Sequence, residues 1–324
     1  MPAAVRRLAA AATALLLATG TGACSGPPGP QAATTRELTD NVTMIVPFGA
    51  GGGSDVAGRA IAAGLESVTT ANITVENREG GAGAIGYSYL LTRRGDPNYL
   101  LATETALLTL PITADTEFDY TDFTPVMSLG EDFTLLVVRA DSPLHGCAEA
   151  VDAARRERVI AGVAGAASLD NVVFTMVEQD TGTSFDRVPF DSGGEVIASL
   201  LAGRIDVASL NPSEVAGQLR SGDLRALCVF AEERYDYPGM TGIPTAREEG
   251  IDVAYGQFRG VLAPGGISDE ALEAWLAASR EFVAGDAYAE YVETSLMQPN
   301  PLYGADFGAY LDESNARLEG VLRP

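Results

Sequence analysis

Short runs of Val, Ile and Leu alternate with amphipathic helical patterns along most of the chain, starting near residue 41. Apolar runs of this length are typical of buried strands, and the intervening helical patterns indicate βαβ units. The pattern therefore predicts an α/β fold with mostly parallel sheets flanked by helices. We expect strands at residues 42–48, 72–77, 99–104, 133–140, 158–164, 184–190, 205–210, 224–230 and 258–264.

Helical periodicity is clearest in five segments between these strands and in two longer segments near the carboxyl end. Ser268 is a good N-cap for the first of the longer helices, which we expect to end at Val283. The chain has 324 residues and is 46% hydrophobic, which is enough for two domains with their own cores. The expected helices span residues 55–67, 84–94, 168–180, 194–202, 212–220, 268–283 and 306–321.

The connections from strand to helix are unusually rich in glycine and small polar residues. GAGGGSD and REGGAGAIG follow the first two strands, and GAASLDN, DSGGE and NPSE precede later helices. Ligands of open α/β sheets bind at these carboxyl ends of strands. Glycine lets the backbone approach a ligand, and helix starts offer free N–H groups. Several such loops together predict an anion site without cationic side chains, although each loop alone could be a tight turn or a cap.

One loop also contains a literal G-x-G-x-x-G, formed by Gly81, Gly83 and Gly86, with Glu104 at the end of the next strand. In a dinucleotide-binding fold, such an acidic residue holds the ribose. An enzyme that binds a nicotinamide-like cofactor is therefore an alternative, but an exported chain makes it the weaker one. A phosphate-binding P-loop is excluded because the chain has no lysine. We expect no cofactor.

The chain is strongly acidic, with a formal net charge of −23. This excludes nucleic acid as a partner, because neutralising phosphates requires a basic surface. The only histidine, His145, precedes a helix and favours a structural role, so we expect neither an enzyme nor a metal site.

The amino-terminal segment has the features of an export signal. Arg6 and Arg7 precede an apolar stretch that is too short to span a membrane comfortably. Small residues then lead to Cys24, as in bacterial lipoproteins, so we interpret residues 1–23 as a signal peptide. Residues 24–40 would be a lipidated cysteine with a flexible tether, placing the protein at the outer face of the cytoplasmic membrane. An ordinary secretory signal, which would leave a free periplasmic protein, is the alternative.

Two cysteines remain if Cys24 carries a lipid. Export permits a disulfide between Cys147 and Cys228, and two separate buried thiols are the other reading.

Several motifs, in this order, resemble a known family. IVPFGAGGGSDVAGRAIA and VENREGGAGAIG open the folded chain, and SGGEVIASLLAGRIDVA, PSEVAGQLRSGDLRALCVFAEER, IPTAREEGIDV and FRGVLAPGGISDEAL follow. Together they resemble the substrate-binding proteins of tripartite tricarboxylate transporters, also called the Bug or TctC-like family. The similarity covers about residues 42–320, nearly the whole expected folded region.

This resemblance implies a two-lobed periplasmic-binding-protein fold of type II, the Venus-flytrap arrangement. Lobe 1 would comprise residues 41–137 and 258–324, and lobe 2 residues 138–257. The implied ligand is a tri- or dicarboxylate such as citrate, and the implied partners are the large and small membrane subunits of a secondary transporter. We expect a monomer. A carboxylate or amino-acid sensor that feeds a signalling system is the alternative function.

The resemblance also implies which positions contact the ligand. Arg259 could pair bidentately with a carboxylate, or form a structural ion pair instead. GAASLDN departs from the usual form of its loop, and Asp170 and Asp191 could favour a ligand with an amine. The implied binding residues are Phe48, Gly51, Gly52, Gly53, Ser54, Asp55, Gly81, Ala82, Gly83, Ala84, Thr103, Thr105, Ala166, Ser168, Asp170, Asp191, Ser192, Gly193, Ser213 and Arg259.

Overall fold

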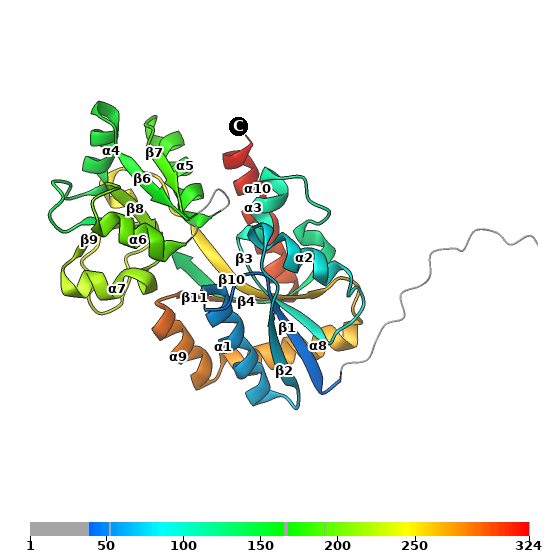
Figure 1. Cartoon of the computed structure of the whole chain (residues 1–324). Helices are drawn as coiled ribbons and strands as arrows, with labels where there is room; N and C mark the ends of the chain where they lie inside the picture. Colours follow the sequence, from blue (N-terminus) through cyan, green and yellow to red (C-terminus); the bar gives the residue numbers. More distant parts are fainter. Residues whose placement is uncertain (1–38, 52, 165–167, 191, 324) are drawn as a thin grey trace, which may run out of the picture. The chain divides into compact units, whose positions relative to one another are not determined.

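The computed structural model describes residues 39–51, 53–164, 168–190 and 192–323. These residues form two α/β lobes, each built on its own sheet (Figure 1). The expectation of a two-lobed α/β fold is therefore confirmed. Signal peptide, Cys24 and most of the expected tether lie outside the described residues.

The sheet of lobe 1 has six strands in the order β11-β4-β10-β3-β1-β2. Parallel pairing is confined to β3, β1 and β2, whereas β10 pairs antiparallel with both β3 and β4, and β11 pairs antiparallel with β4. The strands are β1 (Asn41–Val46), β2 (Asn72–Asn77), β3 (Tyr99–Glu104), β4 (Phe123–Phe133), β10 (Gly256–Pro264) and β11 (Gln298–Tyr303).

The sheet of lobe 2 has five strands in the order β7-β6-β8-β5-β9. Its β7, β6 and β8 are parallel, and β5 lies antiparallel between β8 and β9. Both sheets are thus mixed and not mostly parallel as expected, because β10 and β11 in lobe 1 and β5 in lobe 2 run opposite to the other strands of their sheets. The strands are β5 (Leu135–Arg139), β6 (Ile160–Val163), β7 (Asp186–Pro189), β8 (Val207–Leu210) and β9 (Leu224–Val229).

Helices cover both faces of each sheet, because alternate side chains of a strand point to opposite faces. In β1, Met44 and Val46 face α1, α8 and α9, whereas Ile45 faces α2, α3 and α10. In β5, Val137 packs with α6 and α7, and Val138 with α4 and α5. The helices are α1 (Gly53–Val68), α2 (Ala84–Leu91), α3 (Ala106–Thr113), α4 (Cys147–Arg156), α5 (Leu169–Thr181), α6 (Gly193–Leu201), α7 (Pro212–Ser221), α8 (Asp269–Val283), α9 (Asp286–Ser295) and α10 (Gly304–Leu322).

The chain crosses between the lobes twice. β4 ends at Phe133 and β5 begins at Leu135, so Thr134 alone separates strands of different sheets. Thr134 is fixed by a 2.6 Å hydrogen bond between its Oγ1 and Ser209 Oγ, and its carbonyl accepts from Phe230 N at 2.9 Å. The return crossing lies between β9 and the start of β10 (Figure 1). The expected lobe boundaries at residues 137 and 257 stay a prediction.

Candidate ligand-binding site

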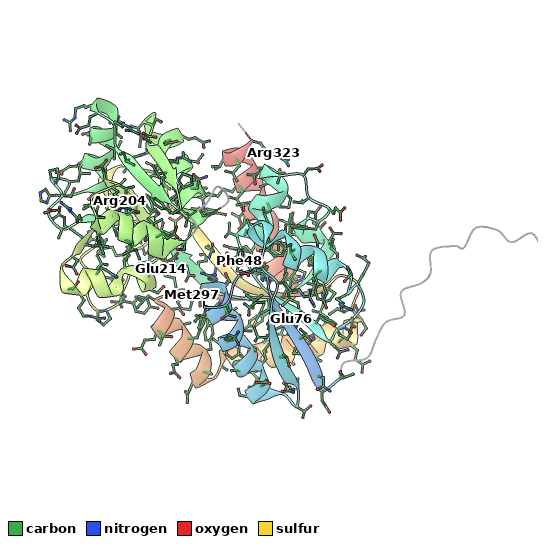
Figure 2. All side chains as sticks on the ribbon, in the orientation of Figure 1. Phe48, Glu76, Arg204, Glu214, Met297 and Arg323 are labelled. Carbon is green, nitrogen blue, oxygen red and sulfur yellow. A yellow bond between two sulfur atoms is a disulfide. The ribbon has the colours of Figure 1, made fainter. Side chains whose placement is uncertain are left out.

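A cavity of about 600 Å³ lies where the carboxyl ends of strands from both lobes meet. This volume is typical of a small-molecule pocket. Phe48 lines it from lobe 1 and Glu214 from lobe 2 (Figure 2). The lining residues are Phe48, Gly49, Ala50, Gly53, Ser54, Glu79, Ala82, Glu104, Ala106, Thr134, Ala164, Ser168, Leu169, Asp170, Ser192, Gly193, Ser209, Leu210, Asn211, Glu214, Gln257 and Arg259.

Asp55 holds the first glycine loop in place through hydrogen bonds to its side chain. Its carboxylate accepts hydrogen bonds at 2.9 Å from Gly51 N, Arg59 Nε and Asn77 Nδ2. Asn77 Nδ2 also donates to Phe48 O at 2.9 Å, so loop, helix α1 and strand β2 are joined through one buried group. The Arg59 hydrogen bond lowers the pKa of Asp55 to about 2, against the opposing effect of its burial. Asp55 thus positions the loop and does not line the cavity.

We predict that Asp55→Asn makes the protein less stable at neutral pH, by about 1–3 kcal/mol, because an amide offers a single acceptor oxygen. The Asp55 pKa is lowered from 3.8 to about 2, so this carboxylate stabilises the fold above pH 3.8 and stops doing so as the pH falls to about 2. The difference in unfolding free energy between wild type and variant should therefore shrink on acidification. Urea denaturation at several pH values measures it, with the exposed change Asp115→Asn as the control. A difference that grew toward low pH would contradict this role.

The second glycine loop adopts a backbone conformation that few residues tolerate. Gly80, Gly81, Ala82 and Gly83 have φ angles of 129°, 59°, 55° and 102° in succession. Ala82 lines the cavity in this conformation. A Cβ on Gly83 would lie 2.8 Å from Tyr87 Cε2, so position 83 requires glycine for space as well as for conformation. Strained backbone of this kind is concentrated at ligand sites.

The third glycine of the G-x-G-x-x-G pattern has a packing role. A Cβ on Gly86 would lie 2.7 Å from Pro47 Cα, so glycine lets α2 approach the end of β1 closely. Glu104, which a dinucleotide fold would use for the ribose, forms an ion pair with Arg259. Gly86 and Glu104 therefore both have structural roles in lobe 1.

We predict opposite effects for two neighbouring substitutions in this loop. Ala82→Gly should be neutral or stabilise by up to about 1 kcal/mol, because glycine relieves a left-handed residue at some entropic cost. Gly83→Ala should destabilise by about 2 kcal/mol or more, because it adds both strain and a clash with Tyr87. Chemical denaturation compares the two. A Gly83→Ala protein as stable as the wild type would show that the loop is not held in this conformation.

Arg259 on β10 is buried and engaged by acidic partners. Its Nε lies 2.7 Å from Asp132 Oδ2, and Nη1 pairs with Glu104 and donates to Ser54 Oγ at 3.3 Å. Ser54 Oγ also donates to Glu104. Of the two readings of Arg259, the described contacts are those of a structural ion pair at the wall of the cavity.

Lobe 2 contributes acidic and polar groups to the opposite wall. Asp170 is 6% exposed and accepts from Ala164 N at 2.5 Å, and burial raises the pKa of its carboxyl group. Glu214 caps α7 by accepting from Asn211 N at 3.2 Å. Ser192 caps α6 by accepting from Glu195 N at 3.3 Å. The caps hold these residues at the carboxyl ends of β6, β7 and β8.

The expected binding residues fall into three groups, and their contact with a ligand stays a prediction. Those that line the cavity are Phe48, Gly53, Ser54, Ala82, Ser168, Asp170, Ser192, Gly193 and Arg259. Those placed beside it without lining it are Gly51, Asp55, Gly81, Gly83, Ala84, Thr103, Thr105 and Ser213. Gly52, Ala166 and Asp191 lie outside the described residues.

Sequence reasoning considered Glu104 only as a ribose-binding residue, and it missed four other acidic and amide groups of the lining: Glu79, Asn211, Glu214 and Gln257. A signal existed for two of them, because Asn211 and Glu214 have the spacing of a capping box. That pattern places both residues at the helix start, whereas the neighbouring Ser213 does not line the cavity.

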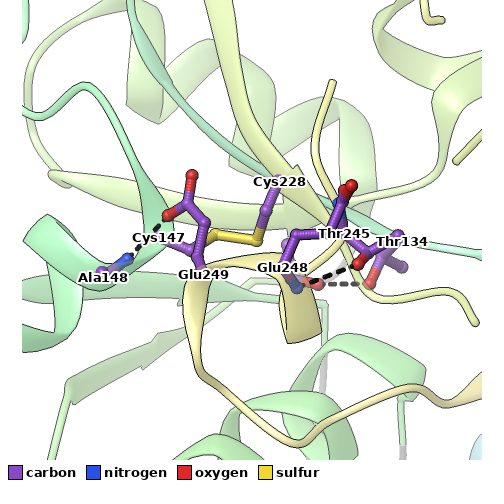
Figure 3. The surroundings of a disulfide bond; sticks show 8 residues. Thr134, Cys147, Ala148, Cys228, Thr245, Glu248 and Glu249 are labelled. Atoms are coloured by element: carbon purple, nitrogen blue, oxygen red, sulfur yellow. Dashed lines mark hydrogen bonds between the residues drawn. A yellow bond between two sulfur atoms is a disulfide. The ribbon is translucent and has the colours of Figure 1, made fainter. Parts of the chain in front are cut away.

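The structure joins Cys147 to Cys228 by a disulfide, with Cα atoms 5.8 Å apart. Figure 3 shows this bond, which ties the start of α4 to β9 near the hydrogen bond from Ala148 N to Glu249. Neither cysteine lines the cavity. Among the described residues, no group of acidic, histidine and cysteine side chains is arranged to hold a metal ion. None of the helices in this part of the chain is long and apolar enough to cross a bilayer.

Two α/β lobes with a ligand-sized cavity at their strand ends define a solute-binding protein. The family described as tripartite tricarboxylate transporter family receptor, TctC, matches residues 57–322. The chain therefore belongs to this family of receptors, as its motifs predicted.

Individual relatives agree with this assignment. BugT of Bordetella pertussis is 27% identical over 236 residues, which cover 69% of this chain and 71% of BugT. A TctC solute-binding protein from Polaromonas, solved without ligand, is 29% identical with a TM-score of 0.75, covering 87% of this chain and 98% of that one. An R. palustris protein solved with adipate has a TM-score of 0.77 at 24% identity, covering 87% and 96%, and supports the fold alone.

Proposed function

We propose that the protein captures a small carboxylate in the cavity between its lobes and delivers it to the membrane subunits of a tripartite tricarboxylate-type transporter. Membership of the receptor family supports binding and transport in place of catalysis. Two structural neighbours from Rhodopseudomonas palustris were solved with adipate and with malate, both of which are dicarboxylates.

The observation that carries this proposal is the Gly80–Gly83 segment beside the start of α1 at one wall of the cavity. Successive residues with positive φ can direct backbone N–H groups at an anion, although Gly83 N here already donates to Gly80 O at 3.1 Å. The start of α1 adds unpaired N–H groups and the positive end of its dipole. Each charge-assisted hydrogen bond contributes about 1.5–3 kcal/mol, so four suffice for micromolar affinity, about 8 kcal/mol.

The test is a thermal-shift screen of the purified protein against small carboxylates and their uncharged amides. A ligand at 100 times its Kd should add about 2.7 kcal/mol of stability. A shift with a carboxylate that is absent with its amide supports an anion receptor. If carboxylates of two to seven carbons gave no shift, the capture of a small carboxylate would be wrong.

We also propose that a lipid on Cys24 anchors the protein to the outer face of the membrane, and that it works there as a monomer on the tether of residues 25–40. Export fits the disulfide between Cys147 and Cys228. Palmitate labelling of cells that express the protein should mark it, and Cys24→Ala should abolish the label and release the protein from membranes. Equal labelling of the variant would contradict anchoring at Cys24.

A further inference from the structure

The cavity that we propose as a carboxylate site has an unusual balance of charge. Its described lining contains four carboxylates and one guanidinium, those of Glu79, Glu104, Asp170, Glu214 and Arg259. The guanidinium is already held by Glu104 and Asp132. No lysine exists in the chain, and the only histidine, His145, does not line the cavity. The described lining therefore offers a ligand no free cationic side chain.

The two walls of the cavity differ in what they can bind. The lobe 1 wall contains Ala82 of the positive-φ segment and the start of α1, where backbone N–H groups can meet an anion, together with Glu79 and with Glu104, which is paired with Arg259. The lobe 2 wall contains Asp170 and Glu214. Glu214 stands over the backbone of Gly193, because a Cβ on Gly193 would lie 2.5 Å from Glu214 Oε1. Both residues line the cavity on the lobe 2 side, where the far end of a ligand held by lobe 1 would lie.

This arrangement of charges should weaken the binding of a dicarboxylate. With one carboxylate on the lobe 1 loops, its second carboxylate would approach Asp170 and Glu214. Two like charges about 4 Å apart near a protein surface repel each other enough to weaken binding by more than about tenfold. An ammonium group at the same place would gain a similar amount and could donate hydrogen bonds to both carboxylates.

We propose that the preferred ligand is a carboxylate whose opposite end carries a protonated amine, with the carboxylate on the lobe 1 loops and the amine on Asp170 and Glu214. This proposal rests on the proposed function, and it specifies the ligand of the same site. It makes the receptor selective for a ligand with no net charge over di- and tricarboxylates.

Calorimetric titration with three matched ligand series tests the proposal. Each series has the same carbon skeletons: linear dicarboxylates such as glutarate, ω-aminocarboxylates such as 5-aminopentanoate, and simple carboxylates such as pentanoate. We expect the best aminocarboxylate to bind at least about tenfold more tightly than the dicarboxylate and the simple carboxylate of equal length. Equal or tighter binding of either would overturn the proposal while leaving a carboxylate receptor. Failure of all three series would overturn the proposed function itself.

A single variant locates the amine. Glu214→Gln removes one charge but keeps an acceptor for the capping hydrogen bond, so the fold should persist, as circular dichroism can verify. The preference for the aminocarboxylate over the dicarboxylate should fall by about tenfold. The matched control Glu273→Gln makes the same change of charge on exposed α8, outside the cavity, and should leave the preference unchanged. If Glu214→Gln also left it unchanged, the amine would not lie at this wall and the proposal would fail.

Discussion

Replacing Arg259 by Leu is expected to lower the free energy of unfolding by about 3–5 kcal/mol. Arg259 is 9% exposed and is the positive centre of an ion triad with Glu104 and Asp132. Removing it leaves two carboxylates close together with little water to solvate them. The triad also connects β3, β4 and β10, which lie side by side in the lobe 1 sheet. Urea denaturation monitored by circular dichroism measures the loss.

Two further variants separate the structural role of Arg259 from a role in binding. Neutralising its partners in the triple variant Arg259→Leu, Glu104→Gln, Asp132→Asn should restore much of the lost stability, because no buried charge remains uncompensated. The exposed change Arg220→Leu on α7 should cost less than about 0.5 kcal/mol. If Arg259→Leu kept its stability but lost carboxylate binding, then the guanidinium would contact the ligand directly and the structural reading would be wrong.

The double variant Cys147→Ala, Cys228→Ala is expected to lose about 2–5 kcal/mol of stability. The disulfide joins residues 81 positions apart, and a bond across so long a loop strongly restricts the unfolded chain. Both cysteines are fully buried in lobe 2 between α4 and β9, so the native packing changes less than the unfolded state. The loss should appear as a lower midpoint in guanidinium denaturation.

Reduction provides the internal control for this second prediction. Denaturation in the presence of dithiothreitol should bring the wild type close to the double variant and leave the variant unchanged. A variant as stable as the oxidised wild type would mean that the bond contributes little. Binding of the ligand should change little at saturating concentration, because neither cysteine lines the cavity.

The elements that periodicity predicted well are those of the βαβ units. The strands at residues 72–77 and 99–104 match β2 and β3 in full, because Val, Ile and Leu runs bounded by turn residues leave little ambiguity. The strand β11 was missed because QPNPLY contains two prolines. Proline is tolerated there because β11 is an edge strand. β4 was missed because FTPVMSLGEDF mixes Pro, Gly and acidic residues. Its place between β11 and β10 is decided by tertiary pairing.

The residues of the candidate site also differ in whether local backbone geometry or tertiary pairing places them at the cavity. Glycine loops are visible in a sequence because local backbone geometry requires glycine, and so Gly53, Ala82 and Gly193 were found. Gln257 was not found, and Glu104 was considered only for a ribose, since both reach the cavity only through the pairing of β3 with β10. The sequence also left open whether Arg259 binds the ligand or forms a structural ion pair, because its partner Asp132 is 127 residues away in the chain.

Thr134, the single residue between strands of the two sheets, also lines the cavity. Any change in the angle between the lobes must be absorbed by the few backbone torsions at this point and at the return crossing. A bound solute would therefore contact one of the two points at which the chain connects the lobes. Binding of a ligand in the cavity should therefore slow amide hydrogen exchange at residues 133–135. This measurement requires no dye and no change to the chain.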